Sequence, residues 1–182
     1  DDFCGVAKSE LRPTCKQCHQ LAGQPNEFDL QFVSALRKKL NDDPSRFTMQ
    51  FWFSPKIEYF HGTAATIHSL CTKKVFVWRP DIQFNSKDTF ESYCPVCKKQ
   101  CKLVHKDYMT PRYAHTLKGG VLVLVGRLQC KGCRGRFSSI DADFFANSPH
   151  AWGSLFPFVF SRQIGFHEDF LSFVLNLYTS GT

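Results

Sequence analysis

Three pairs of cysteines, each separated by two residues, constrain the fold of this chain more than any other feature. The pairs are CKQC (15–18), CPVC (94–97) and CKGC (130–133). A C-x-x-C pair places two thiolates on one tight turn, at a separation that suits a single tetrahedral metal ion. A secreted disulfide scaffold would have scattered half-cystines in an even number, whereas this chain has 9 cysteines. We therefore expect structural zinc and a reducing compartment, either the nucleus or the cytosol.

The second and third pairs predict one zinc site with the pattern C-x2-C-x32-C-x2-C. Pro95 stiffens the first turn, and Gly132 is expected to allow the second its tight conformation. Four free thiols or a thioredoxin-like redox pair fit less well, because no βαβ pattern follows either pair. Cys101 follows closely and could replace a ligand, but we favour a free or half-buried thiol. The expected ligands are Cys94, Cys97, Cys130 and Cys133.

A second zinc ion is expected near the N-terminus, because Cys15 and Cys18 need partners. His68 is one candidate, since its H-x2-C spacing to Cys71 matches a half-site on one helical face. Setting aside Cys101 and the four ligands above, however, leaves a complete set of four cysteines, which we favour. A reduced pair at the surface is the alternative without metal. The favoured ligands are Cys4, Cys15, Cys18 and Cys71.

The apolar pattern predicts an α+β fold, a zinc ribbon with antiparallel strands flanked by helices, plus an N-terminal zinc-stapled subdomain. Residues 27–40 have apolar side chains at helical spacing after a plausible N-cap, Asn26. Strand-like segments follow at 46–55, 74–78 and 121–125, the last preceded by a turn or hairpin at Gly119–Gly120. A short capped helix (139–146), an extended segment (157–161) and a closing helix (167–181) complete the pattern. We divide the chain into an N-terminal subdomain (1–72) and a zinc-ribbon domain (73–182).

Positive charge is concentrated in the predicted ribbon. Between Cys94 and Arg136, ten basic residues accompany one acidic residue, whereas the rest of the chain has 13 basic and 15 acidic residues. A zinc ion with four thiolates carries a charge of −2, which offsets only part of this excess. A solvated basic face is the plain interpretation, and a phosphate-binding surface is the functional one. The candidate phosphate-binding residues are Lys98, Lys99, Lys102, Lys118, Arg127, Lys131, Arg134 and Arg136.

These features favour nucleic-acid binding, to DNA rather than RNA, over catalysis. A site with four cysteine ligands has no open coordination position, and the motifs of zinc deaminases, zincins and P-loop enzymes are absent from the sequence. The alternative function is a protein-docking module anchored by aromatic residues around Trp52, because consecutive strand residues cannot all enter one core. No apolar run reaches the roughly 18 residues that a membrane span requires, so no membrane partner is expected.

The stretches VFVWRP (75–80), CPVC (94–97), CKGC (130–133), FSSID (137–141) and LFPFVFS (155–161) occur together in this order. On these residues the chain, from about 75 to 182, resembles an uncharacterised eukaryotic zinc-ribbon domain that is often found in transposon-derived proteins. The C-x-x-C pairs are generic, whereas W-x-P before them and F-S-S-x-D after them are more specific. The resemblance implies an accessory role in binding nucleic acid or protein. It does not cover residues 1–70.

Overall fold

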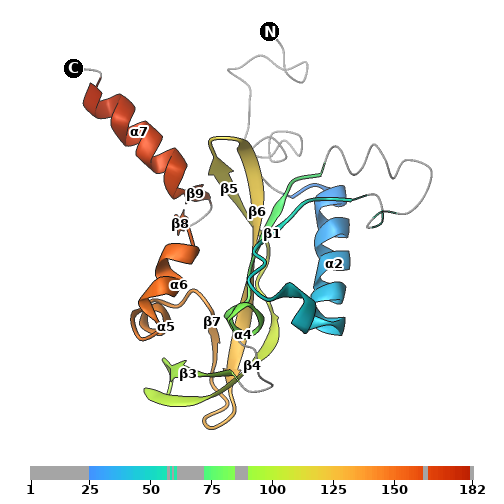
Figure 1. Cartoon of the computed structure of the whole chain (residues 1–182), viewed down its shortest axis with the longest axis vertical. Helices are drawn as coiled ribbons and strands as arrows, with labels where there is room; N and C mark the ends of the chain where they lie inside the picture. Colours follow the sequence, from blue (N-terminus) through green and yellow to red (C-terminus); the bar gives the residue numbers. More distant parts are fainter. Residues whose placement is uncertain are drawn as a thin grey trace, which may run out of the picture.

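The computed structural model describes residues 25–56, 58, 60, 72–84, 90–161 and 164–180 (Figure 1). They form an α+β structure in which a curled mixed sheet has helices on both sides. Among these residues, no helix is both long and apolar enough to cross a membrane. The elements are α2 (Glu27–Asp42), η2 (Pro44–Phe47), β1 (Trp52–Phe53), β2 (Val75–Trp78), α4 (Pro80–Gln83), β3 (Phe90–Cys94), β4 (Lys99–Tyr108), β5 (Arg112–Thr116), β6 (Gly119–Cys130), β7 (Arg136–Ser138), α5 (Ala142–Ala146), α6 (His150–Leu155), β8 (Phe158–Phe160), β9 (Gly165–His167) and α7 (Glu168–Ser180).

The 12-residue strand β6 is shared by two parts of the sheet. Its first half pairs in parallel with β2, from Val75↔Leu122 to Trp78↔Val125, and antiparallel with β5. Its second half pairs antiparallel with β4 and with β7. The strand orders are therefore β1-β2-β6-β5-β9-β8 and β3-β4-β6-β7. One continuous strand thus runs from the centre of the protein to Cys130.

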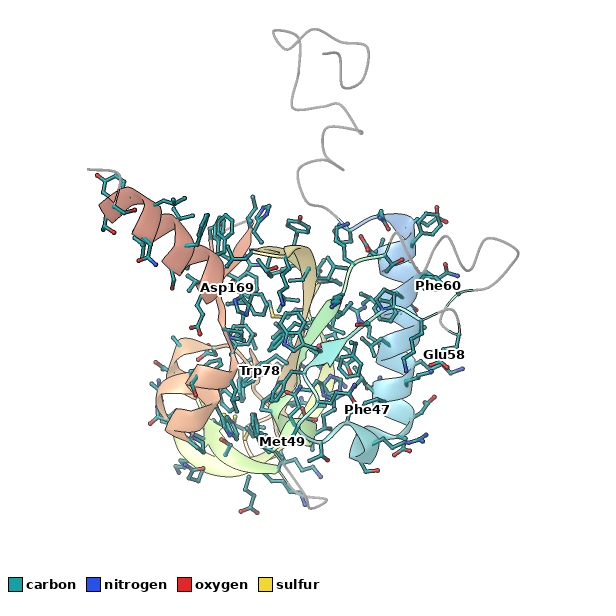
Figure 2. The ribbon with its side chains drawn as sticks, turned by 45° about the horizontal axis from the view of Figure 1, so that its top comes forward. Phe47, Met49, Glu58, Phe60, Trp78 and Asp169 are labelled. Carbon is teal, nitrogen blue, oxygen red and sulfur yellow. The ribbon has the colours of Figure 1, made fainter. Side chains whose placement is uncertain are left out.

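The centre of the sheet is buried on both faces, which explains why β2 and the middle of β6 are almost entirely apolar. Alternate side chains of β2 point to opposite faces. Val75 and Val77 pack against α2, whereas Phe76 and Trp78 face an aromatic cluster that includes residues of α5 and α6. Figure 1 shows α2 and the α5–α6 pair on opposite sides of the sheet, and Figure 2 shows Trp78 among the packed side chains.

Several predicted elements are confirmed. Helix α2 begins after Asn26, whose side chain accepts a hydrogen bond from the Asp29 backbone N–H. The Asp29 carboxylate in turn accepts one from the Asn26 backbone N–H, which completes a capping box. The strand at 74–78, the short helix capped by Asp141, the strand within 157–161 and the closing helix are also present. The division at residue 72 stays a prediction, although α2 and β1 share one core with β2 and β6.

One local prediction is wrong, and a second is confirmed only in part. Residues 46–55 are not one strand, because Pro44 starts a 3-10 helix and Met49, with φ of 57°, turns the chain, so that only Trp52–Phe53 is a strand. The hairpin before β6 exists, but its turn is formed by residues 117 and 118. Thr116 pairs with Gly119, so both glycines of the predicted turn belong to β6.

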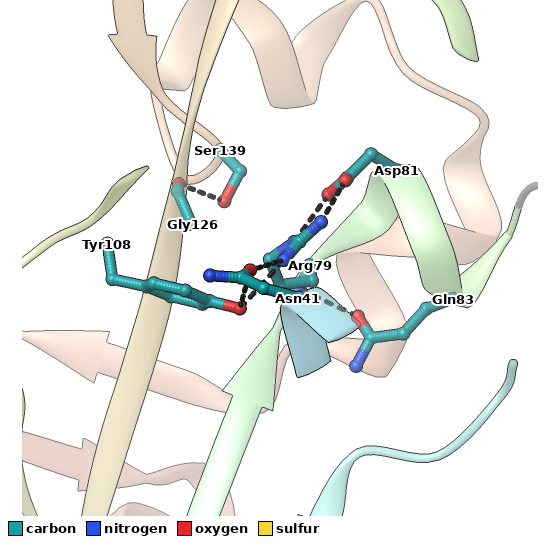
Figure 3. A network of polar contacts seen from close by, with 7 residues as sticks. All are labelled: Asn41, Arg79, Asp81, Gln83, Tyr108, Gly126 and Ser139. Atoms are coloured by element: carbon teal, nitrogen blue, oxygen red, sulfur yellow. Dashed lines mark hydrogen bonds and ion pairs between the residues drawn. The ribbon is translucent and has the colours of Figure 1, made fainter. Parts of the chain in front are cut away.

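A buried polar network fixes the end of β2 against α2 and β4 (Figure 3). The Arg79 guanidinium, whose residue is 4% exposed, donates both Nε and Nη2 to the Asp81 carboxylate. Its Nη1 donates to the Tyr108 hydroxyl at 2.7 Å and to Asn41 Oδ1 at 3.2 Å. Nearby, a Cβ on Gly126 would lie 3.0 Å from Arg79 Cδ. Glycine therefore lets β6 pass beside this ion pair where the strand moves from one half of the sheet to the other.

His105 adds a pH-sensitive group next to this network. Its ring lies 4.6 Å from the Tyr108 ring, and its Nε2 is buried with no hydrogen-bond partner in the described part of the chain. Burial, together with the positive charge of Arg79, lowers the pKa of His105 to about 4, whereas the carboxylates of Asp81 and Asp107 act in the opposite direction. Protonation of this imidazole therefore opposes folding.

We expect the free energy of unfolding to fall as the pH decreases from about 6.5 to about 4, because the unfolded chain then binds a proton that folded His105 does not. A His105→Gln variant should lose this part of the pH dependence. Denaturant titrations of both proteins at pH 7, 6 and 5 measure the effect. Parallel stability profiles for the two proteins would contradict it.

Candidate metal centre

Two hairpin turns carry the cysteine pairs. The first follows Cys94 at the end of β3 and leads into β4, and the second follows Cys130 at the end of β6 and leads into β7. The Lys98 N–H donates to the Cys94 carbonyl at 2.8 Å, and the Arg134 N–H donates to the Cys130 carbonyl at 2.9 Å. Lys98 and Arg134 have φ of 57° and 59°. The two turns therefore repeat one backbone conformation around their cysteines.

The left-handed residue of the second turn is Arg134 rather than a glycine. Gly132 was expected to allow this turn its tight conformation, but among the described glycines only Gly119 has a positive φ. Gly132 lies instead against sulfur, with its Cβ position 3.7 Å from Cys130 Sγ and 3.9 Å from Cys101 Sγ. A Cβ on Gly135 would lie 2.8 Å from the Val96 side chain. Gly135 thus allows the two turns to pack closely, whereas the distances at Gly132 are ordinary van der Waals contacts.

The four predicted ligands of the first site come together. The sulfur atoms of Cys94, Cys97, Cys130 and Cys133 all lie within 4.8 Å of one another, and those of Cys94 and Cys133 are 3.7 Å apart. A tetrahedral zinc ion with Zn–S bonds of about 2.3 Å needs sulfurs about 3.8 Å apart, so this cluster could hold one such ion. The pairing of β4 with β6 aligns the turns, because it places Leu103 opposite Cys130.

Burial and hydrogen bonding act differently on the thiols of the cluster. Burial raises the pKa of Cys94 to about 12 and that of Cys97 to about 11. Burial also acts to raise the pKa of Cys130, but hydrogen bonds from the backbone of Cys133 and Gly132 and from neighbouring thiols outweigh it and lower the pKa to about 6. Thiolates bind metal, so an ion would have to displace protons from Cys94 and Cys97, and its binding would release them.

The 32 residues between the two pairs include β5 as well as β4 and most of β6. Strand β4 pairs with the second half of β6 from Leu103 to Tyr108, whereas β5 pairs with the first half of β6, in the other part of the sheet. The long spacing therefore arises because the connection leaves the metal-binding hairpins and contributes a strand to the central sheet. The remaining antiparallel arrangement, β3-β4-β6-β7, has one cysteine pair in each terminal turn.

Cys101 is a half-buried free thiol on β4. Its sulfur lies 3.6 Å from Cys97 Sγ, but it does not belong to the group of four sulfurs. It pairs with Ser92 across the β3–β4 hairpin. The second predicted site cannot be placed in the same way, because Cys4, Cys15, Cys18, Cys71 and the alternative ligand His68 lie outside the described residues, and a second zinc ion stays a prediction.

We expect Cys101→Ser to keep the metal content and the stability of the parent protein, with a change below roughly 1 kcal/mol, since the substitution is small and the four ligands remain. Metal analysis of the purified variant and its urea unfolding curve test this. Loss of one metal ion in this variant would show that Cys101 is itself a ligand.

Five of the eight predicted phosphate-binding residues surround the cysteine turns. Salt bridges within the described residues involve none of these five side chains, four of which are exposed. Lys102 is the half-buried member and lies opposite Glu91. The five are Lys99, Lys102, Lys131, Arg134 and Arg136.

The structure separates the other three from this group. Lys98 forms an ion pair with Asp143 at 2.5 Å, and Arg127 forms one with Asp107 at 2.6 Å. Lys118 lies in the turn that precedes β6, and at about 3.3 Å per residue the 12 residues of that strand separate it from Cys130 by roughly 40 Å along the strand. The contact between Lys98 and Asp143 could not be predicted from local sequence, because the two residues are 45 positions apart.

Comparison of the chain with protein-family models, with curated proteins and with solved structures gives no match. The resemblance to transposon-derived zinc-ribbon domains therefore stays a prediction. Any assignment of function has to come from the chemistry of the cysteine cluster and from the side chains around it.

Proposed function

We propose that this chain is a zinc-stabilised nucleic-acid-binding module in which the two cysteine turns form the metal-binding end of a zinc ribbon. One structural zinc ion would be held by Cys94, Cys97, Cys130 and Cys133, and a second by the N-terminal cysteines. Four thiolate ligands leave zinc no open position for a substrate, so the proposed role of the ion is to hold the turns together. The proposal is supported by the separation of the four sulfurs, which matches tetrahedral coordination.

The observation that carries the binding proposal is the group of basic side chains at the metal end that form no salt bridge within the described residues. Five positive charges exceed the −2 of a zinc tetrathiolate and the single charge of Glu91, which lies opposite Lys102. Local neutralisation therefore does not account for all five. Exposed lysine and arginine side chains on neighbouring turns suit the phosphates of a nucleic-acid backbone, which supply most of the salt-dependent affinity. We propose DNA as the polymer, and the nucleus or the cytosol as the compartment.

A charge-removal experiment tests this proposal. In Lys131→Gln/Arg134→Gln, two exposed charges of the second turn are lost while each position keeps a flexible polar side chain. Loss of two phosphate contacts should lower the slope of log affinity against log salt by about 1.8 on duplex DNA, equally for unrelated sequences. Binding titrations at several salt concentrations measure the slope.

A matched control removes the same charge elsewhere. Lys38 lies on α2 and Lys118 lies in the distant hairpin turn, and both are exposed. Lys38→Gln/Lys118→Gln should retain the slope of the parent protein. Equal slopes for all three proteins, or equal reductions in both variants, would contradict binding through the metal end. Parallel titrations with single-stranded RNA test the preference for DNA.

A protein-docking module is the second candidate, and the exposure of Trp52 favours it. Trp52 is 43% exposed although its ring lies 5.0 Å from the Phe76 ring and 6.1 Å from the Phe158 ring. Val159 on the edge strand β8 is 58% exposed. The partner would be a chromatin-associated or transposon-associated protein bound through apolar contacts. Such binding should persist at high salt and should fail in Trp52→Ala, whereas phosphate binding should weaken steeply with salt.

A further inference from the structure

A fifth sulfur lies beside the metal cluster and has no assigned role. Cys101 Sγ is 3.6 Å from Cys97 Sγ, which is as close as the shortest ligand-to-ligand contact, 3.7 Å between Cys94 and Cys133. A Cβ on Gly132 would lie 3.9 Å from Cys101 Sγ, so the second turn also approaches this sulfur closely. The side chain is half-buried rather than enclosed. A small oxidant can therefore reach the Cys101 thiol, which is not one of the four proposed metal ligands.

We propose that Cys101 is a site of reversible oxidation, at which a peroxide forms a disulfide between Cys101 and Cys97 and removes Cys97 from the metal. The loss of a metal ligand rests on the proposed zinc site, whereas formation of the Cys97–Cys101 disulfide does not. Four sulfurs suffice for tetrahedral zinc, and the fifth remains available as a partner for one of them. Cys97 is the partner because its sulfur is near both to Cys101 and to the other ligands.

The reaction balances with hydrogen peroxide as the oxidant. The Cys101 thiol is oxidised to a sulfenic acid, and the peroxide is reduced, with release of one water. The Cys97 thiol then loses its proton and its sulfur attacks the Cys101 sulfur, the S–S bond forms, and the sulfenic hydroxyl takes up that proton and leaves as a second water. Both electrons of the overall oxidation come from the two sulfurs. A metal ion would keep only three thiolates, which weakens its binding, and a dithiol reductant would restore the fourth.

Tryptic digestion, followed by fragmentation to distinguish Cys94 from Cys97 within peptide 88–98, locates the bond. Lys98 and Lys99 separate Cys97 from Cys101, so trypsin cleaves between the two cysteines. A disulfide between them would join two peptides that separate on reduction. We would treat the full chain, purified under reducing conditions, with hydrogen peroxide, block the remaining thiols and map the disulfides by mass spectrometry. A chromogenic chelator would record zinc release over the same time, and the zinc content would be measured beforehand.

We expect the Cys97–Cys101 peptide to be the main disulfide, and we expect Cys101→Ser to release zinc about tenfold more slowly than the parent protein. Cys101→Ala serves as a second variant if the serine protein is unstable. A main disulfide between Cys94 and Cys133, or equal rates of zinc release in both proteins, would overturn the inference. If the chain contains no zinc, the proposed metal site fails, and the disulfide map still decides whether Cys101 reacts with Cys97.

Discussion

Cys94→Ser is expected to lose one metal ion and to show the largest loss of stability of any single substitution in this chain. Cys94 is fully buried at the end of β3, where its sulfur lies 3.7 Å from that of Cys133. Structural zinc contributes on the order of 10 kcal/mol to the folding of small zinc-finger peptides. Here, buried apolar residues such as Leu103 and Leu128 also stabilise these strands, so the effect should be smaller than in a zinc finger. We expect the free energy of unfolding to fall by more than roughly 5 kcal/mol and the β3-β4-β6-β7 strands to melt non-cooperatively.

Elemental analysis and denaturant unfolding of the purified variant measure both effects. Cys101→Ser is the matched control, since it removes a neighbouring sulfur that is not expected to bind the ion. A Cys94→Ser protein with the metal content and the unfolding midpoint of its parent would contradict the structural role of the cluster.

Trp78→Ala is expected to destabilise the protein by about 4 kcal/mol, because it removes a large, fully buried side chain from the aromatic cluster. The Trp78 ring stacks on Phe145 with centroids 5.7 Å apart, and its Nε1 donates to the Ser139 carbonyl at 2.9 Å. The substitution would leave that carbonyl unsatisfied and create a cavity between the sheet and α5. Urea unfolding measures the loss of free energy.

The control for this substitution is Trp52→Ala, which removes the same side chain from a half-exposed position on β1. Its expected cost is about 1 kcal/mol, because solvent already reaches much of the ring and little area is exposed anew. Equal losses in the two variants would contradict the placement of Trp78 in the core and of Trp52 at the surface.

The metal cluster could be predicted from sequence because its requirement is local and chemical. Each C-x-x-C pair places two sulfurs on one turn, and only two such turns need to meet. The elements with strong local signals, such as the capped helix after Asn26 and the strand at 75–78, were predictable for the same reason. Their identity depends on side-chain periodicity within a few residues.

Long-range pairing could not be predicted in this way. The parallel pairing of β2 with β6 joins Val75 to Leu122, and nothing in either strand specifies the other as its partner. The same holds for the ion pair between Lys98 and Asp143, which removes one predicted phosphate contact. The position of Lys118 depends on β6, because this 12-residue strand starts directly after Lys118 and separates it from Cys130.

The apolar surface of α7 shows another limit of pattern reasoning. Its apolar spacing correctly predicted a helix, but no residue of α7 is buried, and Tyr178 is 83% exposed. Only the beginning of the helix contacts the sheet, through Phe170, whose ring lies 5.8 Å from the Phe166 ring. Figure 1 shows the rest of α7 extending away from the sheet. Periodicity therefore predicted the element but not where it lies.

The most direct test of the account is the metal content and coordination of the full chain purified without added zinc. We predict two zinc ions per chain by elemental analysis, with X-ray absorption showing a sulfur shell at about 2.3 Å. Loss of one ion in Cys94→Ser would assign that ion to the cluster of Cys94, Cys97, Cys130 and Cys133. If the chain binds one zinc ion and Cys94→Ser loses it, the N-terminal site is contradicted and the cluster of four cysteines is supported. A chain that binds no zinc, or whose metal content is unchanged by Cys94→Ser, would contradict the central claim.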